Sequence, residues 1–127
     1  MAERVILKKI LLVEDNAMNR ELVKEILELS HYHLKCANNG IEALSLLDAE
    51  LFDLILTDIN LPKMNGIELI GKIREKESKH LKVIAMTSDN HTENGETFEE
   101  VGFDGFIQKP FKIHEFRDYV KSFIDGF

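Results

Sequence analysis

Polar side chains that can do chemistry follow several short apolar runs of this sequence. Three are acids, one is a hydroxyl and one is an amine: Glu14, Asp15, Asp58, Thr87 and Lys109. Singly, each has an ordinary explanation, because an acid after a strand often caps the next helix and a lysine is usually a solvated charge. Together, the five residues need a different explanation, because neighbouring carboxylates repel each other unless a cation lies among them.

Magnesium is the cation that such a set of ligands favours. Mg²⁺ takes carboxylates, carbonyls and waters, and phosphate oxygens commonly complete its coordination. A carboxylate beside Mg²⁺ and a lysine can attack a phosphoryl group, because the cations neutralise the phosphoryl oxygens while the acid supplies the nucleophile. The residue types therefore predict phosphoryl chemistry at an aspartate, provided that the fold brings them together.

Five β-rich runs alternate with segments of helical periodicity. The predicted strands are 9–13, 33–37, 54–57, 83–87 and 105–108. The apolar faces of four predicted helices are Leu22, Val23, Ile26, Leu27 and Leu29, then Ile41, Leu44 and Leu47, then Ile67, Ile70 and Ile73, and finally Ile113, Phe116, Val120 and Phe123. Asn16 suits the cap of the first helix. A further helix is expected within the poorly patterned segment 90–101, "NHTENGETFEEV".

This alternation predicts the fold class. Short continuous apolar strands separated by helices indicate a parallel sheet buried on both faces, with right-handed crossovers, which is a doubly wound α/β domain. Ligand sites of such sheets lie at the carboxyl ends of the strands. The acids, the hydroxyl and the lysine should therefore converge in one pocket.

Size and composition exclude several classes of protein. The 127 residues fit one domain, and the net charge of -7 argues against nucleic-acid binding through a general basic surface. The apolar runs fall far short of the roughly 18 residues of a membrane helix, and the N-terminus lacks the apolar region of a signal peptide, so we expect a cytoplasmic protein without membrane contact. The single cysteine, Cys36, excludes an internal disulfide and is expected to be a small buried hydrophobe.

Four stretches of the sequence carry a resemblance to a known family. "ILLVEDN", "DLILTDINLPKMNG", "VIAMTS" and "GFIQKPF" resemble the receiver domain of two-component response regulators, the family of the bacterial chemotaxis regulator. The resemblance implies a flavodoxin-like sheet of strand order 2-1-3-4-5 with helices on both faces. It also implies one receiver domain over 1–127 without an output domain. Its partner would be a histidine kinase or a histidine phosphotransfer domain.

The resemblance assigns the phosphoryl-transfer residues. Asp58 would accept the phosphoryl group, with Asp15 binding Mg²⁺ directly and Glu14 binding it through water or as an alternative ligand. Asn60 would offer its backbone carbonyl to the metal, and Mn²⁺ is expected to substitute for Mg²⁺. Lys109 would pair with a carboxylate at rest and with the phosphoryl group afterwards. Such a chain is a signalling receiver that catalyses only its own phosphorylation and dephosphorylation.

The resemblance also assigns the residues of the switch. The hydroxyl of Thr87 would bind a phosphoryl oxygen, and the aromatic ring of Phe106 would turn inward when Thr87 moves. Pro110 would follow a cis peptide bond. The side chains of Asn60 and Asp89 would tune hydrolysis of the phosphoryl group.

Three positions near the site bear on how far the assignment extends. Ser88 stands where many members of the family have alanine, and both are small enough to leave the phosphoryl group accessible. Gly95 falls where the fourth helix of the family runs, and glycine weakens a helix interior, so the output surface is where this chain departs from the pattern. Gly66 fits the turn after Asp58, where glycine tolerates a positive φ.

Other readings of the strand-end aspartate are weaker. A phosphohydrolase of the haloacid dehalogenase type needs a second acid two residues after its nucleophile, and that position is Asn60. A nucleotide binder needs a glycine-rich loop after the first strand, where this chain has two acids instead. A scaffold with a vestigial site conflicts with the presence of every expected residue. A stand-alone regulator and the receiver of a hybrid histidine kinase both remain open.

Overall fold

The computed structural model describes residues 7–76 and 81–124, in which strands and helices alternate. The strands are β1 (Lys9–Val13), β2 (His33–Ala37), β3 (Leu54–Asp58), β4 (Lys82–Thr87) and β5 (Gly105–Gln108). The helices are α1 (Ala17–Leu29), α2 (Gly40–Ala49), α3 (Gly66–Lys76) and α4 (Ile113–Ile124). The predicted domain over 1–127 therefore includes 1–6, 77–80 and 125–127, which lie outside the described residues.

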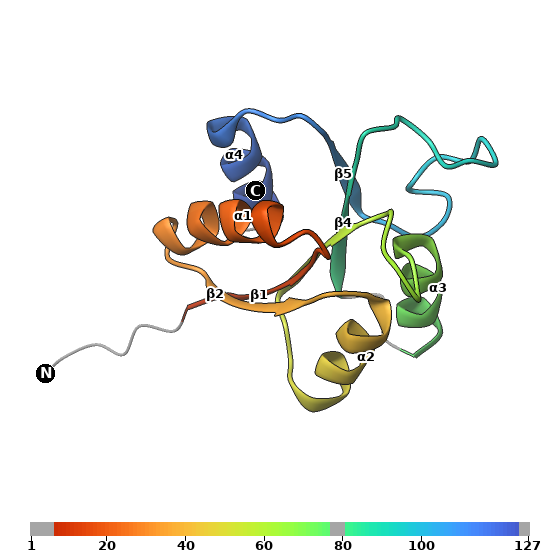
Figure 1. Ribbon diagram of the computed structural model, residues 1–127, viewed down its shortest axis with the longest axis horizontal. Coiled ribbons are helices and arrows are strands. Elements are labelled where there is room, and N and C mark those ends of the chain that lie inside the picture. The colour runs from red at the N-terminus through yellow and green to blue at the C-terminus, as the bar shows by residue number, and fades with distance from the viewer. Residues whose placement is uncertain (1–6, 77–80, 125–127) are drawn as a thin grey trace, which may run out of the picture.

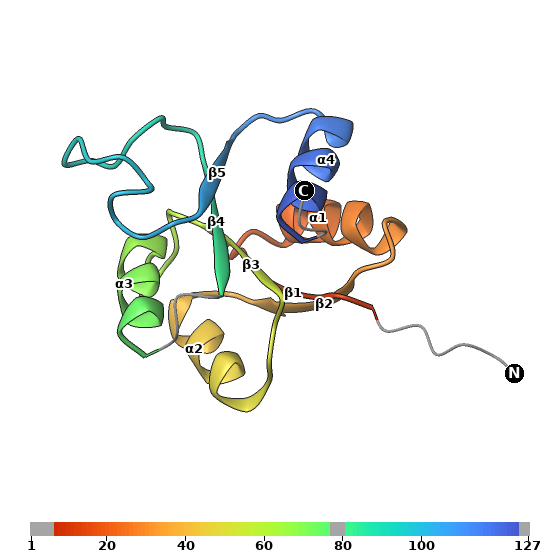
Figure 2. The same cartoon turned by 180° about the vertical axis from the view of Figure 1, so that it is seen from behind.

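The strands form one parallel sheet of order β2-β1-β3-β4-β5, which confirms the predicted doubly wound fold. Helices α1 and α4 cover one face of the sheet, and α2 and α3 cover the other (Figure 1; Figure 2 gives the view from behind). The central strand β3 is buried along its whole length because both of its faces are covered.

Each face of the sheet has its own apolar core. Successive side chains of a strand point to opposite faces, so Ile10 and Leu12 of β1 pack with α1 and α4, whereas Leu11 and Val13 pack with α2 and α3. This alternation in the central strands fixes their register. It also fixes which residues stand at the strand ends.

The prediction of a helix within 90–101 is wrong. The connection from β4 to β5 is a long loop (Figure 1) that contains one helical turn. Thr97 and Glu100 form a capping box around that turn, because each side chain accepts a hydrogen bond from the backbone N–H of the other. The turn ends at once at Gly102, whose φ is 119°, a conformation that favours glycine.

The first part of the same loop also uses a glycine to turn. Gly95 has a φ of 82°, and its N–H donates to the carbonyl of Thr92 at 2.9 Å. Thr92 also bonds Glu96 through both its backbone and its hydroxyl. These local hydrogen bonds occupy backbone groups that a helix would need, so no helix forms in this part of the loop.

The predicted apolar face of α1 is only partly buried. Val23, Ile26 and Leu27 lie in the core, whereas Leu22 is 48% exposed and Leu29 is 75% exposed. The helix begins after Asn16, whose side chain accepts a hydrogen bond from the N–H of Asn19 and confirms the predicted cap. Leu22 and Leu29 lie beside the buried stripe, because the rotation of the helix from one residue to the next places these two positions away from the sheet.

Similar flank positions occur elsewhere in the chain. Ile41 and Ile113 are 50% and 56% exposed, contrary to the prediction that they belong to buried helix faces. Cys36 is half-buried at the edge strand β2 and packs against the core of α1 and α4, so it is less covered than predicted. Burial raises the pKa of its thiol.

Candidate functional site

The carboxyl ends of β1 and β3 lie side by side and bring three acids together. Val13 pairs with Thr57 in the sheet, so Glu14 follows β1 beside Asp58 at the end of β3. Glu14, Asp15 and Asp58 each offer a carboxylate oxygen within 4.8 Å of the others. Glu14 and Asp58 are buried, at 1% and 8% exposed, whereas Asp15 faces solvent.

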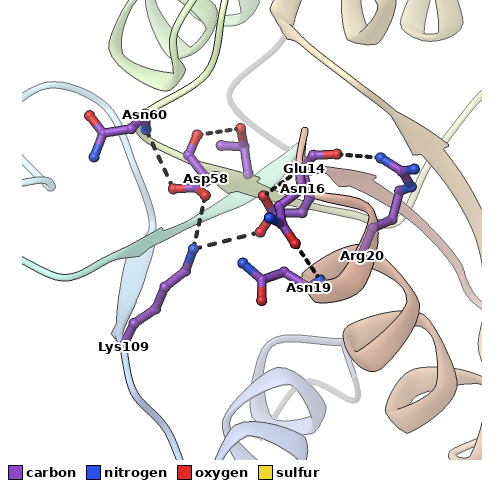
Figure 3. A network of polar contacts seen from close by, with 8 residues as sticks. Glu14, Asn16, Asn19, Arg20, Asp58, Asn60 and Lys109 are labelled. Atoms are coloured by element: carbon purple, nitrogen blue, oxygen red, sulfur yellow. Dashed lines mark hydrogen bonds and ion pairs between the residues drawn. The ribbon is translucent and has the colours of Figure 1, made fainter.

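Lys109 reaches this cluster from the end of β5. Its Nζ lies 2.9 Å from Oδ2 of Asp58 and 3.6 Å from Oε1 of Glu14 (Figure 3). The backbone N–H of Lys109 donates to the carbonyl of Thr87 at 2.7 Å, and the peptide bond between Lys109 and Pro110 is cis. The lysine is thus held between two of the acids by the strand that precedes it.

The pKa values of Glu14 and Lys109 are both raised in this site. Burial raises the pKa of Glu14, the hydrogen bond from the Asn16 N–H opposes this, and the negative charge of Asp58 adds to it. Burial lowers the pKa of Lys109, but the hydrogen bond to Asp58 and the charges of Asp58 and Glu14 outweigh burial, so the pKa is raised. Lys109 therefore keeps its positive charge. The negative charge of Glu14 is unfavourable unless a further cation is present.

The donor set suits a hard divalent cation. The three carboxylates and the lysine leave two negative charges when all are ionised, which one Mg²⁺ would neutralise. The Asp15 carboxylate has no hydrogen bond or ion pair within the described residues, so it remains available as a ligand. Asn60 lies next to the cluster, and its N–H donates to Oδ1 of Asp58 at 3.4 Å.

Thr87 and Asp89 lie on the other side of Asp58. Thr87 is buried, and its Oγ1 accepts a hydrogen bond from the N–H of Asp89 at 3.0 Å. Thr87, Asp89 and Asn60 line a cavity of about 200 Å³ together with Phe98. The cavity separates the strand ends from the long loop between β4 and β5.

Phe106 lies in β5 and is half-buried. Its ring centroid is 5.1 Å from that of Phe98, which is itself buried at 1% exposure. Sequence reasoning missed Phe98 as a residue next to the site. The capping box formed by Thr97 and Glu100 was the available signal, because it marks a short turn that can present one apolar side chain.

Gly66 is required for a reason other than the predicted positive φ. Its φ is not positive, and the left-handed residue in this turn is Lys63, at 64°. A Cβ at Gly66 would lie 2.5 Å from the carbonyl oxygen of Asp58 and 2.9 Å from Cα of Ile59. The start of α3 therefore approaches the backbone after Asp58 too closely for any side chain.

A second hollow, of about 450 Å³, lies between α1 and the connection from β5 to α4. Glu14 and Lys109 lie at one end of it, and Leu22, Val23 and Phe111 contribute apolar lining. The groove therefore adjoins two of the charged side chains of the cluster.

The arrangement of acids, lysine and threonine on this sheet is that of a receiver domain. The family of the response regulator receiver domain matches residues 10–121, and the chain belongs to this family of two-component signalling proteins. Among curated relatives, the polar-differentiation response regulator DivK of Brucella anthropi is 34% identical over 118 residues, covering 92% of this chain and 96% of that protein.

Solved receiver structures are similar to this chain over almost its whole length. The receiver domain of a sensor histidine kinase from Pseudomonas aeruginosa, with a magnesium ion coordinated in its active site cleft, is 28% identical with a TM-score of 0.85, covering 94% of this chain and 99% of that one. Response regulator TrrA of Thermotoga maritima, in complex with Mg²⁺–BeF, is 33% identical with a TM-score of 0.82, covering 92% and 99%. No helix within residues 7–76 and 81–124 is long and apolar enough to cross a membrane.

Proposed function

We propose that this chain is a phosphorylation-dependent switch in which Asp58 accepts a phosphoryl group from the phosphohistidine of a histidine kinase or a histidine phosphotransfer domain. The observation that carries the proposal is the buried Asp58 carboxylate, held 2.9 Å from the Lys109 ammonium and within 4.8 Å of two further acids. Such an acid is oriented, charged and surrounded by groups that bind phosphoryl oxygens or their counterion.

The transfer is a displacement at phosphorus. A carboxylate oxygen of Asp58 forms the new P–O bond while the P–N bond to the donor imidazole breaks, and the imidazole leaves with the electron pair. Lys109 pairs with Asp58 before the transfer and with a phosphoryl oxygen after it, so its ammonium has an anionic partner in both states. Asp15, Asp58 and the backbone carbonyl of Asn60 would hold Mg²⁺, with Glu14 acting through water or as an alternative ligand; the ion would neutralise the phosphoryl charge, and Mn²⁺ would substitute for it.

The phosphorylated state is read through Thr87 and Phe106. The Thr87 hydroxyl moves from the Asp89 N–H to a phosphoryl oxygen, and the space it leaves allows the Phe106 ring to turn inward. Hydrolysis returns the chain to rest, with Asn60 and Asp89 shaping access of water. The chain thus catalyses only its own phosphorylation and dephosphorylation, and it acts on a protein effector in the cytoplasm as a single receiver unit.

The groove beside Asp58 suits the protein that donates the phosphoryl group. Lys109, Glu14 and Leu22 line the groove, and Leu22 and Met18 are exposed apolar side chains of α1. A helix that carries a phosphohistidine can bury these apolar side chains while its imidazole approaches Asp58. Both a stand-alone regulator and a hybrid-kinase receiver would use this contact.

Phosphoryl acceptance at Asp58 is the direct test. The chain is incubated with phosphoramidate and Mg²⁺, and incorporation is measured by intact mass. We expect one phosphoryl group per chain, none in the Asp58→Asn variant and none after chelation, because three acids repel an anion without the metal. Mn²⁺ should restore incorporation.

Asp48→Asn is the matched control, because Asp48 lies on α2 and pairs with Lys76 at 3.6 Å, away from the cluster. It should leave incorporation unchanged. Incorporation that persists in Asp58→Asn, or that ignores chelation, would overturn the proposed function.

A further inference from the structure

Arg20 bridges two loops at the carboxyl end of the sheet. It lies in the first turns of α1, is half-buried, and its side chain points back toward the end of β1 (Figure 3). Its Nη1 donates to the backbone carbonyl of Glu14 at 2.9 Å and to Oδ1 of Asn38 at 2.7 Å. One guanidinium nitrogen thus joins the loop after β1 to the loop after β2.

The second anchor of Arg20 is itself fixed. Asn38 donates from its backbone N–H and from Nδ2 to Oε1 of Glu42, at 2.9 and 3.2 Å. The N–H of Glu42 in turn donates to Oδ1 of Asn39, which caps α2. Hydrogen bonds therefore run from the start of α2, through Asn38 and Arg20, to the carbonyl of Glu14.

The Glu14 carbonyl, which ends this series of hydrogen bonds, sets the position of Asp15. The oxygen of Glu14 belongs to the peptide unit that joins Glu14 to Asp15, and a peptide unit is planar. Holding that oxygen therefore fixes the direction in which the chain enters Asp15. The Asp15 side chain has no hydrogen bond or ion pair of its own within the described ranges, so its backbone is what places it.

We infer that Arg20 is a positioning residue for the metal site, which holds the Asp15 carboxylate in place through the Glu14 carbonyl before the cation binds. The inference rests on the proposed function. Groups that orient metal ligands commonly matter for affinity almost as much as the ligands themselves. The planar guanidinium suits this task, because it holds two acceptors in a fixed geometry that a lysine ammonium does not reproduce.

The positive charge of Arg20 acts on the site as well, because its loss alone should strengthen binding of a cation, and the chain contains a control for this effect. Lys24 lies one turn further along α1, is also half-buried, and carries the same charge. Its removal changes the net charge by the same amount but leaves the Glu14 carbonyl bonded. Arg20→Met and Lys24→Met therefore separate geometry from charge.

The test measures Mg²⁺ affinity by isothermal titration calorimetry on the full chain, with thermal unfolding in chelator recorded for each variant. We expect Arg20→Met to weaken the Mg²⁺ Kd about tenfold, at the lower end of the range for groups that orient ligands, and Lys24→Met to stay within about twofold. Asn38→Ala, at an exposed position, removes only the second anchor of Arg20 and should weaken the Kd in the same direction by a smaller factor. It serves as the test if Arg20→Met does not fold.

Two results would overturn the inference. An Mg²⁺ Kd in Arg20→Met within about twofold of the wild type would show that Arg20 only ties α1 to the loop after β2. Equal weakening in Arg20→Met and Lys24→Met would show that altered packing of α1, not the bond to the Glu14 carbonyl, is responsible, because loss of a positive charge alone should strengthen Mg²⁺ binding. If the wild-type chain binds no Mg²⁺ at all, the proposed function fails first, so the two failures are distinguishable.

Discussion

At the scale of single residues, the site holds more negative than positive charge. Three acids face one lysine, and the buried Glu14 carries its charge at a cost because burial raises its pKa. A divalent cation bound at the site would offset this excess of negative charge. The same polar character extends to Asn60 and Asp89, which line the adjoining cavity.

The lifetime of the phosphorylated state should depend on these two polar side chains. Asn60 and Asp89 are exposed and able to hold a water near the phosphoryl group, so we expect a short-lived acyl phosphate. Replacing both with leucine should slow its decay about tenfold, which corresponds to about 1.4 kcal/mol of barrier. Decay is followed by intact mass after the donor is removed, with Ser88→Ala as the neighbouring control. An unchanged decay rate in the double variant would refute this role.

At the scale of elements, the connection from β4 to β5 is fixed at one end only. Arg74 of α3 donates from Nε to the carbonyl of Gly102 and from Nη2 to Oδ2 of Asp104, both at 2.9 Å. Among the described residues, 91–96 hydrogen-bond only with one another, in the local turn around Gly95, and residues 90–97 are almost wholly exposed. The half of the loop that faces the cavity is therefore the less stable half.

Amide hydrogen exchange should report this difference. We expect residues 90–97 to exchange quickly in the resting chain and to slow on beryllofluoride binding more than α1 does, because the new Thr87 contact orders the loop beside it. The measurement is exchange by mass spectrometry with and without beryllofluoride and Mg²⁺. Unchanged exchange over 90–97, with Asp58 shown to be occupied, would place the output surface elsewhere.

Helix α3 offers a matched pair of glycines for testing how closely it approaches the backbone at Asp58. Gly66→Ala places a Cβ against the Asp58 carbonyl and Ile59, and overpacking of this kind typically costs about 1–3 kcal/mol. A Cβ at Gly71 would meet no atom within 4 Å, so Gly71→Ala should instead stabilise the helix by about 0.5–1 kcal/mol. Urea unfolding measures both, and destabilisation of similar size in the two variants would contradict the close approach.

At the scale of the whole molecule, the groove beside α1 adjoins Glu14 and Lys109 of the site. Helix α1 presents Leu22 at the groove, while Leu29 lies near the other end of the same helix and outside the groove lining. Both side chains are exposed, at 48% and 75%. They therefore form a matched pair for testing where the phosphoryl donor docks.

Leu22→Asp should slow transfer from a phosphorylated histidine phosphotransfer domain about tenfold, the effect of losing about 1.4 kcal/mol at an interface. Transfer from phosphoramidate should stay unchanged, because that donor needs no docking surface. Leu29→Asp should leave both rates unchanged. Equal slowing by the two substitutions, or none by Leu22→Asp, would remove α1 from the docking surface.

The sequence by itself determined the sheet and the residues at its carboxyl edge. Short apolar runs bounded by turn residues, such as the one before Asp58, are typical of buried strands, and parallel strands bring their ends to one edge, so Glu14 and Lys109 were expected to meet Asp58. The approximate bounds of all five strands followed from the same local pattern.

Tertiary structure alone decided the contacts that depend on how neighbouring elements and loops are packed against one another. The bond from Arg20 to Asn38, the burial of Phe98 against Phe106 and the approach of Gly66 to the Asp58 carbonyl leave no periodic trace in the sequence. The missing helix between β4 and β5 had the same origin, because local turn hydrogen bonds and one buried aromatic ring prevailed over a weak helical pattern. Periodicity reports which face of an element is buried, whereas these contacts depend on how the elements are packed.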